Sequence, residues 1–426
     1  MTESIRNDLI AQLKQEVQSH VDLTSLTDEE LQALATSSLE AKIEWAKEHN
    51  PEAYRELSTL NFREKQFIIS AVYESVRGLG VLGQIIGDPD ITEVMINGYK
   101  DIFIEKAGRL YKMDNQFESR RELEIIITKF VSMAGRQVNE SEPVVDTRLA
   151  DGSRVNVVMP PIALNGPIVT IRRFPKEAMT VQKLIDYGSI TPEVAEVLQL
   201  LVSCKYNVFV SGGTGSGKTT FLNALSNFIP RDERVITIED SAELQIKNVD
   251  NLVRLETRNA GPDGSGAISI RDLIKSALRM RPERIVVGEV RGAEAIDMLQ
   301  AMNTGHDGSL STGHANSTHD MISRLETMVL QGAAGLPLDA IRQQIASALD
   351  IIIHLSRLRD KSRKTVEIVE VLNYDQERRL ININPLYEFQ EDEYSTLKKV
   401  SGSLVRTGNK MVNIDKLVGA GIDRVI

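Results

Sequence analysis

The sequence has a single cysteine and no long apolar run, and each shortage excludes a class of protein. Cys204 is alone among 426 residues, so the chain forms no intrachain disulfide and no zinc site built from several cysteines. No stretch reaches the roughly 18 uninterrupted apolar residues that a membrane-spanning helix needs. The first residues carry charges of both signs and no apolar core, which is not the pattern of a secretory signal. We therefore expect a cytoplasmic protein.

The chain also lacks an excess of basic residues. It has 50 lysines and arginines against 60 aspartates and glutamates, a formal net charge of −10. Proteins that chiefly bind nucleic acid normally carry a basic excess, because phosphate contacts supply much of their affinity. A local basic patch is compatible with an acidic whole, so the charge argues against a nucleic-acid partner without excluding one.

Residues 1–80 have the periodicity of a small helical bundle. Thr27–Glu30 fits a capping box, with a hydroxyl at the N-cap and a carboxylate three residues later. Apolar residues recur at helical spacing from Leu31 to Ala46, and a second such run ends near Gly78–Gly80. We interpret this part as a structural or docking appendage.

Residues 81–175 change to the alternating pattern of strands. Turn signals at Asn97–Gly98 and Asp151–Gly152 separate runs of alternating apolar residues, and the second signal predicts a hairpin. An apolar stripe over residues 123–134 predicts one helix. We expect a small α+β domain here, an antiparallel sheet that carries a helix, followed by a linker near Pro175.

Residues 176–426 alternate helices with short, fully apolar strands. This pattern is typical of an α/β domain in which helices cover both faces of a parallel sheet. With about 150 residues per domain as a guide, the length of the chain agrees with the resulting division into two to three domains.

A phosphate-binding loop opens this last region. The segment Gly212–Thr220 has the spacing Gly-x-x-x-x-Gly-Lys-Thr between a buried strand and a helix. Glycines let main-chain N–H groups converge on an anion, and the following helix adds the positive end of its dipole. Lys218 supplies a positive charge for the β- and γ-phosphates, and the Thr219 hydroxyl is a ligand for Mg²⁺. The residues expected to bind the nucleotide are Gly212, Gly213, Thr214, Gly215, Ser216, Gly217, Lys218, Thr219 and Thr220.

Two later strands end in acidic residues, at the edge where ligands bind in open α/β sheets. One strand leads into Glu239, Asp240 and Glu243. The other ends in Glu289. The residue before it is Gly288, at a position where many ATPases with a phosphate-binding loop have an aspartate. A nucleotide site needs one carboxylate to hold Mg²⁺ through water and another to orient the attacking water, and we expect these two strand ends to supply them.

A histidine and several arginines complete the set of candidates. His314 lies in a segment rich in small residues and hydrogen-bond donors, which suits a sensor of the γ-phosphate. His306 and His319 are equally consistent with ordinary loop positions. Phosphoryl transfer also needs added positive charge, and an arginine contributes on the order of a thousandfold in rate. Arg154 and Arg173 are candidates because the α+β domain that holds them could be swung over the nucleotide.

Four motifs, in order along the chain, carry a resemblance to a known family. They are Gly-Gly-Thr-Gly-Ser-Gly-Lys-Thr-Thr, Ile-Thr-Ile-Glu-Asp-Ser-Ala-Glu-Leu, Arg-Ile-Val-Val-Gly-Glu-Val-Arg-Gly and Met-Asn-Thr-Gly-His-Asp-Gly-Ser-Leu-Ser-Thr-Gly-His. These resemble the Walker A, Asp-box, Walker B and His-box motifs of the type II/IV secretion ATPase superfamily. The likeness is closest to the CpaF/TadA branch, which powers tight-adherence (Flp-type) pilus assembly, and it covers roughly residues 78–400.

The resemblance implies a RecA-like ATPase domain preceded by a PAS-like α+β domain. It implies a homo-hexamer, peripheral on the inner face of the cytoplasmic membrane, that uses ATP and Mg²⁺. Hydrolysis would move an inner-membrane platform protein that adds or removes pilin. The residues to which the resemblance gives catalytic roles are Lys218, Glu239, Glu243, Glu289, His314, Arg154 and Arg173, with Thr219 and Glu289 at the metal. Glu243 or Glu239 would orient the water, and the two arginines would complete the site of a partner domain or neighbouring subunit.

Other functions stay open on the sequence alone. A conjugation-type secretion ATPase or a nucleic-acid translocase would share the same motifs, and a nucleotide-gated scaffold would bind ATP without turnover. The chain has no Asn-Lys-x-Asp motif for reading guanine, which favours ATP over GTP.

Overall fold

The computed structural model describes residues 3–20, 28–76, 81–82, 85, 88, 90–106, 108–149, 152–173, 179–260, 265–333 and 335–422. Thr27 of the expected capping box, Gly78–Gly80, Asp151 of the expected hairpin and Pro175 of the expected linker lie outside these residues. The chain divides into two compact units, Met1–Lys176 and Glu177–Ile426. None of the helices that can be described combines the length and apolar character needed to cross a membrane.

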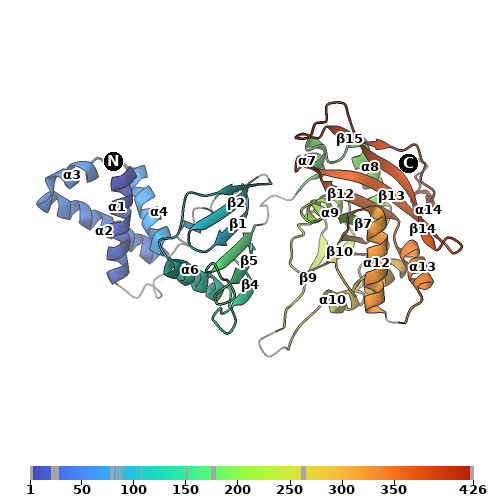
Figure 1. Cartoon of the computed structure of the whole chain (residues 1–426), viewed down its shortest axis with the longest axis horizontal. Helices are drawn as coiled ribbons and strands as arrows, with labels where there is room; N and C mark the ends of the chain where they lie inside the picture. Colours follow the sequence, from blue (N-terminus) through green and yellow to red (C-terminus); the bar gives the residue numbers. More distant parts are fainter. Residues whose placement is uncertain are drawn as a thin grey trace. The chain divides into compact units, whose positions relative to one another are not determined.

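The described helices at the start of the first unit lie together (Figure 1), and their apolar side chains form one cluster. They are α1 (Glu3–His20), α2 (Asp28–His49), α3 (Pro51–Leu57) and α4 (Phe62–Val76). Leu13, Leu31 and Ile68, from three different helices, are fully buried in that cluster. The side chain of Asn50 caps α3 by accepting a hydrogen bond from the N–H of Ala53. The assignment of residues 1–80 as a separate bundle stays a prediction.

An antiparallel sheet with a helix follows in the same unit. Its strands are β1 (Ile91–Asn97), β2 (Asp101–Lys106), β3 (Arg109–Lys112), β4 (Val144–Arg148), β5 (Arg154–Val158) and β6 (Ile168–Arg172), in the order β3-β2-β1-β6-β5-β4. Helix α6 (Arg120–Met133) buries Leu123, Ile127 and Val131 in the cluster that the sheet forms. Strands β4 and β5 pair from Val144↔Val158 to Arg148↔Arg154. The likeness of this part to PAS domains stays a prediction.

A mixed sheet is the centre of the second unit. Its strands are β7 (Val208–Gly212), β8 (Arg234–Glu239), β9 (Asn251–Glu256), β10 (Arg284–Val290), β11 (Leu310–His314), β12 (Ile351–Arg357), β13 (Arg363–Asp375), β14 (Leu380–Glu391) and β15 (Gly402–Arg406), in the order β15-β14-β13-β12-β7-β11-β10-β8-β9. Strands β12, β7, β11, β10, β8 and β9 pair in parallel, which confirms the α/β prediction. The three antiparallel strands β13, β14 and β15 were not expected. A connection as short as the one from β12 to β13 permits only an antiparallel return.

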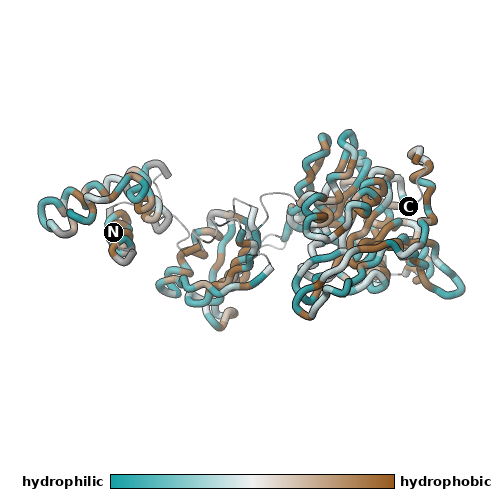
Figure 2. The backbone as a smooth tube through the Cα atoms, turned by 90° about the horizontal axis from the view of Figure 1, so that it is seen from above, coloured by the Kyte–Doolittle hydropathy of each residue, from teal (hydrophilic) through white to brown (hydrophobic). Residues whose placement is uncertain are grey.

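Helices cover both faces of this sheet, so its central strands are buried on two sides. These helices are α7 (Val181–Asp186), α8 (Pro192–Ser203), α9 (Lys218–Ser226), α10 (Ile270–Ala277), α11 (Ala295–Asn303), α12 (Thr318–Gly332), α13 (Leu338–Ala348) and α14 (Asp415–Gly419). Val208 and Val210 pack on the face with α8 and α9, and Phe209 packs on the face with α11, α12 and α13. Figure 2 shows the resulting brown, hydrophobic interior of this unit. Because helices pack on both faces of β7, the position of its carboxyl end is fixed.

A buried ion pair joins the start of β10 to the segment before β8. The side chain of Arg284 is 0% exposed and that of Glu233 is 7% exposed. Arg284 Nη2 donates to Glu233 Oε1 over 3.0 Å, its Nε also bonds that carboxylate, and Nη1 donates to the carbonyl of Val202 over 2.6 Å. Glu233 also has Lys205 Nζ at 3.7 Å from its Oε1, whereas the buried Arg284 relies on Glu233 for its carboxylate partner.

We expect Glu233→Ala to lower the free energy of unfolding of the second unit by about 3–5 kcal/mol, because Arg284 would be left as an uncompensated buried charge. Asp250→Ala is the control, since it removes an exposed pair with Arg231 and should leave stability nearly unchanged. Urea unfolding is followed by circular dichroism, because the single tryptophan, Trp45, lies in the first unit. Equal losses in the two variants would contradict the buried-pair account.

Candidate functional site

The phosphate loop has the backbone that its glycines permit. Strand β7 ends at Gly212 and helix α9 begins at Lys218, and between them Gly215 (φ 72°) and Gly217 (φ 94°) adopt the left-handed conformation. A Cβ on Gly212 would stand 2.5 Å from the Leu355 carbonyl oxygen and 2.5 Å from Ser216 Oγ. A side chain at 212 would therefore push the loop off the neighbouring strand, which is why this position takes only glycine.

Lys218 points back into the loop that precedes it. Its side chain is largely buried, and its Nζ donates to the carbonyl of Gly213 over 3.1 Å and lies 3.2 Å from Nδ1 of His314. The hydroxyl of Ser216 is buried without a hydrogen-bond partner in the described part of the chain. A buried ammonium and an unmatched hydroxyl at a helix N-terminus fit the phosphate oxygens of a nucleotide.

His314, at the end of β11, connects Lys218 to the acid of β10. Burial lowers the pKa of His314, and the nearby charges of Lys218 and Arg291 lower it further, against the opposing effect of Glu289. The ring is therefore neutral at pH 7. Because Nδ1 faces the Lys218 ammonium, it acts as the acceptor, and the proton lies on Nε2, which is 2.7 Å from Glu289 Oε1.

The two oxygens of Glu289 have different neighbours. Its Oε2 accepts a hydrogen bond from Arg291 Nε over 2.7 Å. Its Oε1 is buried and lies 2.7 Å from Nε2 of His314, in a geometry that makes no regular hydrogen bond to a described residue. A buried carboxylate oxygen in this state suits Mg²⁺ or its water, together with the Thr219 hydroxyl. Among the residues that the structure describes, no group of three or more His, Cys, Asp or Glu side chains could hold a metal by itself. Mg²⁺ usually keeps several waters and substrate phosphates as ligands, so a hydroxyl and a carboxylate fit it.

The two Asp-box glutamates differ in environment. Glu239 is 3% exposed, and its Oε1 accepts hydrogen bonds from the N–H groups of Glu243 and Leu244, each over 2.9 Å. Burial raises the pKa of Glu239 to about 7. Its side chain also packs on Gly288, where a Cβ would stand 3.0 Å from Glu239 Cγ. Glu239 thus holds the loop of Glu243 and occupies the space that a side chain at 288 would need.

Glu243 is tied to the helix that follows the phosphate loop. Its carbonyl accepts a hydrogen bond from Nδ2 of Asn223, in α9, over 3.4 Å, and Oδ1 of Asn223 accepts one from the N–H of Gln245 over 2.7 Å. The main chain of Glu243 is therefore fixed from two sides, by Glu239 and by α9. Of the two glutamates, Glu243 is the better placed to meet a water.

Arg291 joins the acidic ends of β8 and β10, a role that its position in the sequence did not indicate. Beyond its bond to Glu289, its Nη1 lies 3.3 Å from Asp240 Oδ2, and its N–H donates to Glu294 Oε1 over 2.6 Å. Arg363 was also missed: its Nε donates to the carbonyl of Gly215 over 2.8 Å. Only the order of strands in the sheet brings residue 363 to the loop, so no local motif could have identified it.

Arg154 and Arg173 lie in the first unit, whereas the other candidates lie in the second. Arg173 Nη1 donates to the carbonyl oxygens of Asp88 and Ile91, the latter over 3.3 Å. Arg154 lies in β5, opposite Arg148 on one side and Arg172 on the other. The action of these two arginines on the nucleotide stays a prediction.

A cavity of about 580 Å³ adjoins the acidic strand ends. Asp240, Arg258, Arg271, Arg291 and Glu294 are among its lining residues. It includes no residue of the phosphate loop, so the cavity does not define the nucleotide site.

Comparisons with known proteins found one matching family and several relatives. The model of the family described as type II/IV secretion system protein matches residues 76–406. A Mycobacterium tuberculosis relative, named "putative conjugal transfer protein", is 33% identical over 297 residues, which are 68% of this chain and 84% of the relative. The type IV secretion system protein VirB11 of Brucella suis is 34% identical over 302 residues, 63% of this chain and 82% of that protein. The crystal structure of the Brucella suis VirB11 ATPase with sulphate has 31% identity and a TM-score of 0.38, and the match covers 68% of this chain and 92% of that one.

The raised pKa of Glu239 predicts a pH-dependent stability. Between pH 4.5, its ordinary pKa, and pH 7, the unfolded chain loses this proton while the folded chain keeps it, so folding becomes less favourable as the pH rises. Glu239→Gln keeps an acceptor for the two N–H groups and removes this dependence. We expect the variant to gain about 3 kcal/mol relative to wild type between pH 4.5 and pH 8, measured by urea unfolding. Parallel pH profiles would contradict the assignment.

Proposed function

This chain belongs to the type II/IV secretion system protein family and is an ATP hydrolase, and we propose that it is the hexameric motor that drives a pilus or secretion machine. One observation carries the proposal. The buried ammonium of Lys218, the neutral ring of His314 and the carboxylate of Glu289 lie in one continuous series beside the phosphate loop. Such a series links the place of the γ-phosphate to the acid that would hold the metal.

The residues divide the work of hydrolysis. On nucleotide binding, the Lys218 ammonium exchanges the Gly213 carbonyl for phosphate oxygens, and the N–H groups of the loop face the same anion. Thr219 and Glu289 would hold Mg²⁺, which would supply positive charge for the phosphates. Glu243 orients the attacking water, while Glu239, largely protonated below pH 7, holds the loop that carries Glu243.

His314 would report the state of the γ-phosphate to the rest of the site. Its Nε2–H faces Glu289 and its Nδ1 faces Lys218, so movement of either group towards a nucleotide changes the partners of the ring. Arg154 and Arg173 would add positive charge from a neighbouring subunit or from their own first unit. A ring of six subunits would place such arginines at each nucleotide.

We propose that the motor is peripheral on the inner face of the cytoplasmic membrane and acts on an inner-membrane platform protein. The motif resemblance supports the CpaF/TadA branch and hence assembly of a tight-adherence pilus. The Mycobacterium tuberculosis relative, named for conjugal transfer, and VirB11 support a second candidate, a conjugation-type secretion ATPase.

Mutation of the site tests the enzymatic part. Lys218→Ala and Glu289→Gln should each lower Mg²⁺-dependent ATP hydrolysis by a factor of at least about 100, the size of effect seen when one preorganised electrostatic group is removed. Glu283→Gln is the matched control, because Glu283 is an exposed carboxylate just before β10, at the opposite end from Glu289. Phosphate release is measured at saturating ATP. Equal rates of ATP hydrolysis in Glu283→Gln and Glu289→Gln would contradict the proposed role of Glu289.

Deletion of the gene tests the biological part. If the chain drives a tight-adherence pilus, surface filaments disappear and return with the wild-type gene but not with the Lys218→Ala gene. If it drives conjugal transfer, filaments persist and the frequency of DNA transfer falls instead. Electron microscopy of cells and mating assays distinguish the two outcomes. Unchanged filaments, transfer and protein secretion would reject both candidates while leaving the enzymology intact.

A further inference from the structure

Strands β8 and β10 bring two carboxylates to the same edge of the sheet. The two strands are neighbours and pair in parallel up to Ile238 and Val287. Two residues further along the chain from each of these lie Asp240 and Glu289. Because the carboxyl ends of parallel strands meet at one edge, the two acids leave the sheet together, and ionised carboxylates in such positions repel each other. A cation that contacts both acids removes this repulsion.

The side chain of Arg291 contacts both acids. Its Nε donates to Glu289 Oε2 over 2.7 Å, and its Nη2 lies 2.5 Å from the same oxygen. Its Nη1 donates to Asp240 Oδ2 over 3.3 Å. Both contacts to Glu289 act on one oxygen, so the other oxygen, Oε1, is left facing Nε2 of His314 at 2.7 Å. The guanidinium group therefore sets the orientation of the Glu289 carboxylate.

The main chain that carries Arg291 is fixed as well. Glu294, the N-cap residue of α11, accepts hydrogen bonds at its Oε1 from the N–H of Arg291 over 2.6 Å and from the N–H of Gly292 over 2.9 Å. The next residue, Ala293, lies directly on α12, because a Cβ on Gly332 would stand 2.4 Å from the Ala293 carbonyl oxygen. Arg291 is thus held at its backbone by Glu294 and at its guanidinium group by two acids.

The exposure of these groups leaves Arg291 little share in the stability of the fold. The side chain of Arg291 is 58% exposed and that of Asp240 is 42% exposed, whereas that of Glu289 is 17% exposed. Ion pairs between exposed side chains contribute little to the free energy of folding, because water and salt screen them. The group that Arg291 does fix is the half-enclosed carboxylate of Glu289.

We propose that Arg291 is a positioning residue for ATP hydrolysis, which holds the Glu289 carboxylate so that Oε1 is presented to Mg²⁺ or its water. The inference deepens the proposed function and rests on it, because it needs Glu289 to serve a bound nucleotide. Arginine suits this task, since its planar guanidinium group reaches two carboxylates with separate N–H donors. Removing a partner that orients a metal ligand typically costs about 10- to 100-fold in metal affinity or activity.

The proposal has Arg291 act through Glu289, which distinguishes it from a residue that contacts the nucleotide. Removal of Arg291 should then matter only while the carboxylate at 289 is present. In Glu289→Gln the charge that Arg291 pairs with is already gone, so the further loss of Arg291 should cost little. An arginine that binds phosphate by itself would instead multiply the two losses, as independent sites do.

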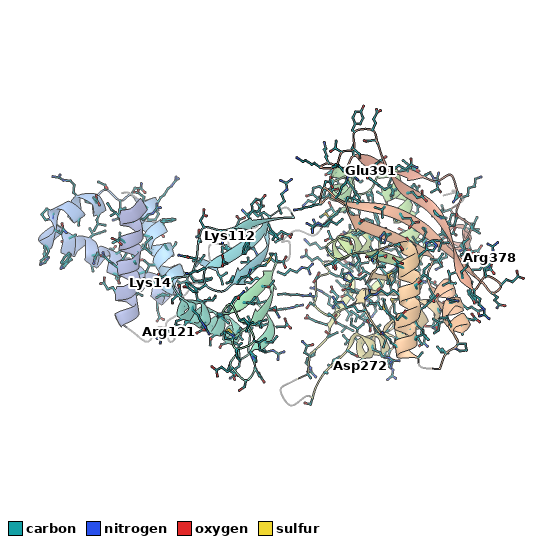
Figure 3. The ribbon with its side chains drawn as sticks, in the orientation of Figure 1. Lys14, Lys112, Arg121, Asp272, Arg378 and Glu391 are labelled. Atoms are coloured by element: carbon teal, nitrogen blue, oxygen red, sulfur yellow. The ribbon has the colours of Figure 1, made fainter. Side chains whose placement is uncertain are left out.

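The experiment uses the full chain and compares wild type, Arg291→Ala, Arg291→Lys, Glu289→Gln and the double variant of Arg291→Ala with Glu289→Gln. Arg378→Ala is the control, because Arg378, labelled in Figure 3, has a carboxylate neighbour, Asp375, at the turn between β13 and β14. Phosphate release at saturating Mg-ATP gives kcat. Titration calorimetry gives the affinity for the non-hydrolysable analogue AMP-PNP with Mg²⁺ and with EDTA, and thermal unfolding gives the Tm.

We expect Arg291→Ala to lower kcat about 10- to 100-fold and to weaken AMP-PNP binding about tenfold with Mg²⁺ but not with EDTA. Arg291→Lys should recover part of both losses, since it keeps the charge without the contact to two acids. The double variant should have the kcat of Glu289→Gln to within about twofold. Arg378→Ala should match wild type, and Arg291→Ala should keep the wild-type Tm.

The contrary results each overturn the inference and leave the nucleotide site in place. A wild-type kcat in Arg291→Ala would remove the role altogether, and multiplied losses in the double variant would make Arg291 independent of Glu289. Weaker AMP-PNP binding in EDTA would place Arg291 on the phosphates, and a Tm well below that of wild type would assign it to the fold. Full recovery in Arg291→Lys would mean that charge, and not orientation, is what Glu289 needs. If wild type neither hydrolyses ATP nor binds AMP-PNP, the proposed function itself fails.

Discussion

The loop between β7 and α9 depends on one buried ammonium group, that of Lys218. Lys218 is held by a loop carbonyl and by the ring of His314, and the next group in the series, Glu289, is shared with Arg291. Positive, neutral, negative and positive groups therefore follow one another from Lys218, at the start of α9, to Arg291, just after β10. An anion that draws Lys218 away from these partners would alter each later member of the series, and this is the physical basis of the proposed link between phosphate and metal.

Rigid elements hold that series in place. Strand β7 is buried on both faces, so the loop begins from a fixed point, and α9 binds the Glu243 loop through Asn223. Glu239 and Glu243 are chemically alike but differ in burial. Glu239 lies deep in the protein, with its pKa raised to about 7, and it accepts the N–H of Glu243, whereas the side chain of Glu243 is more accessible. Environment, rather than residue type, separates the two.

Sequence patterns predicted the parts of the fold that obey local rules. The structure confirms the buried strand before the phosphate loop, the strands β8 and β10 with acidic residues at their ends, and the parallel arrangement around them. These strands could be predicted because a strand that is buried on both faces has an uninterrupted apolar sequence. The strands after β12 were not expected. Their place in the sheet depends on pairing between distant segments. In addition, β13 and β14 contain alternating or polar residues, which are a weaker sequence signal for a strand than an apolar run.

The amino-acid sequence by itself determined the phosphate loop, its glycines, its lysine and the acids that follow two strands, since each is a local pattern with one physical use. Only the tertiary structure decided which groups meet. It brought Arg291 between Asp240 and Glu289, and it put Arg363 beside Gly215, because strand order is set by how a whole sheet buries its surface and not by any neighbouring residues.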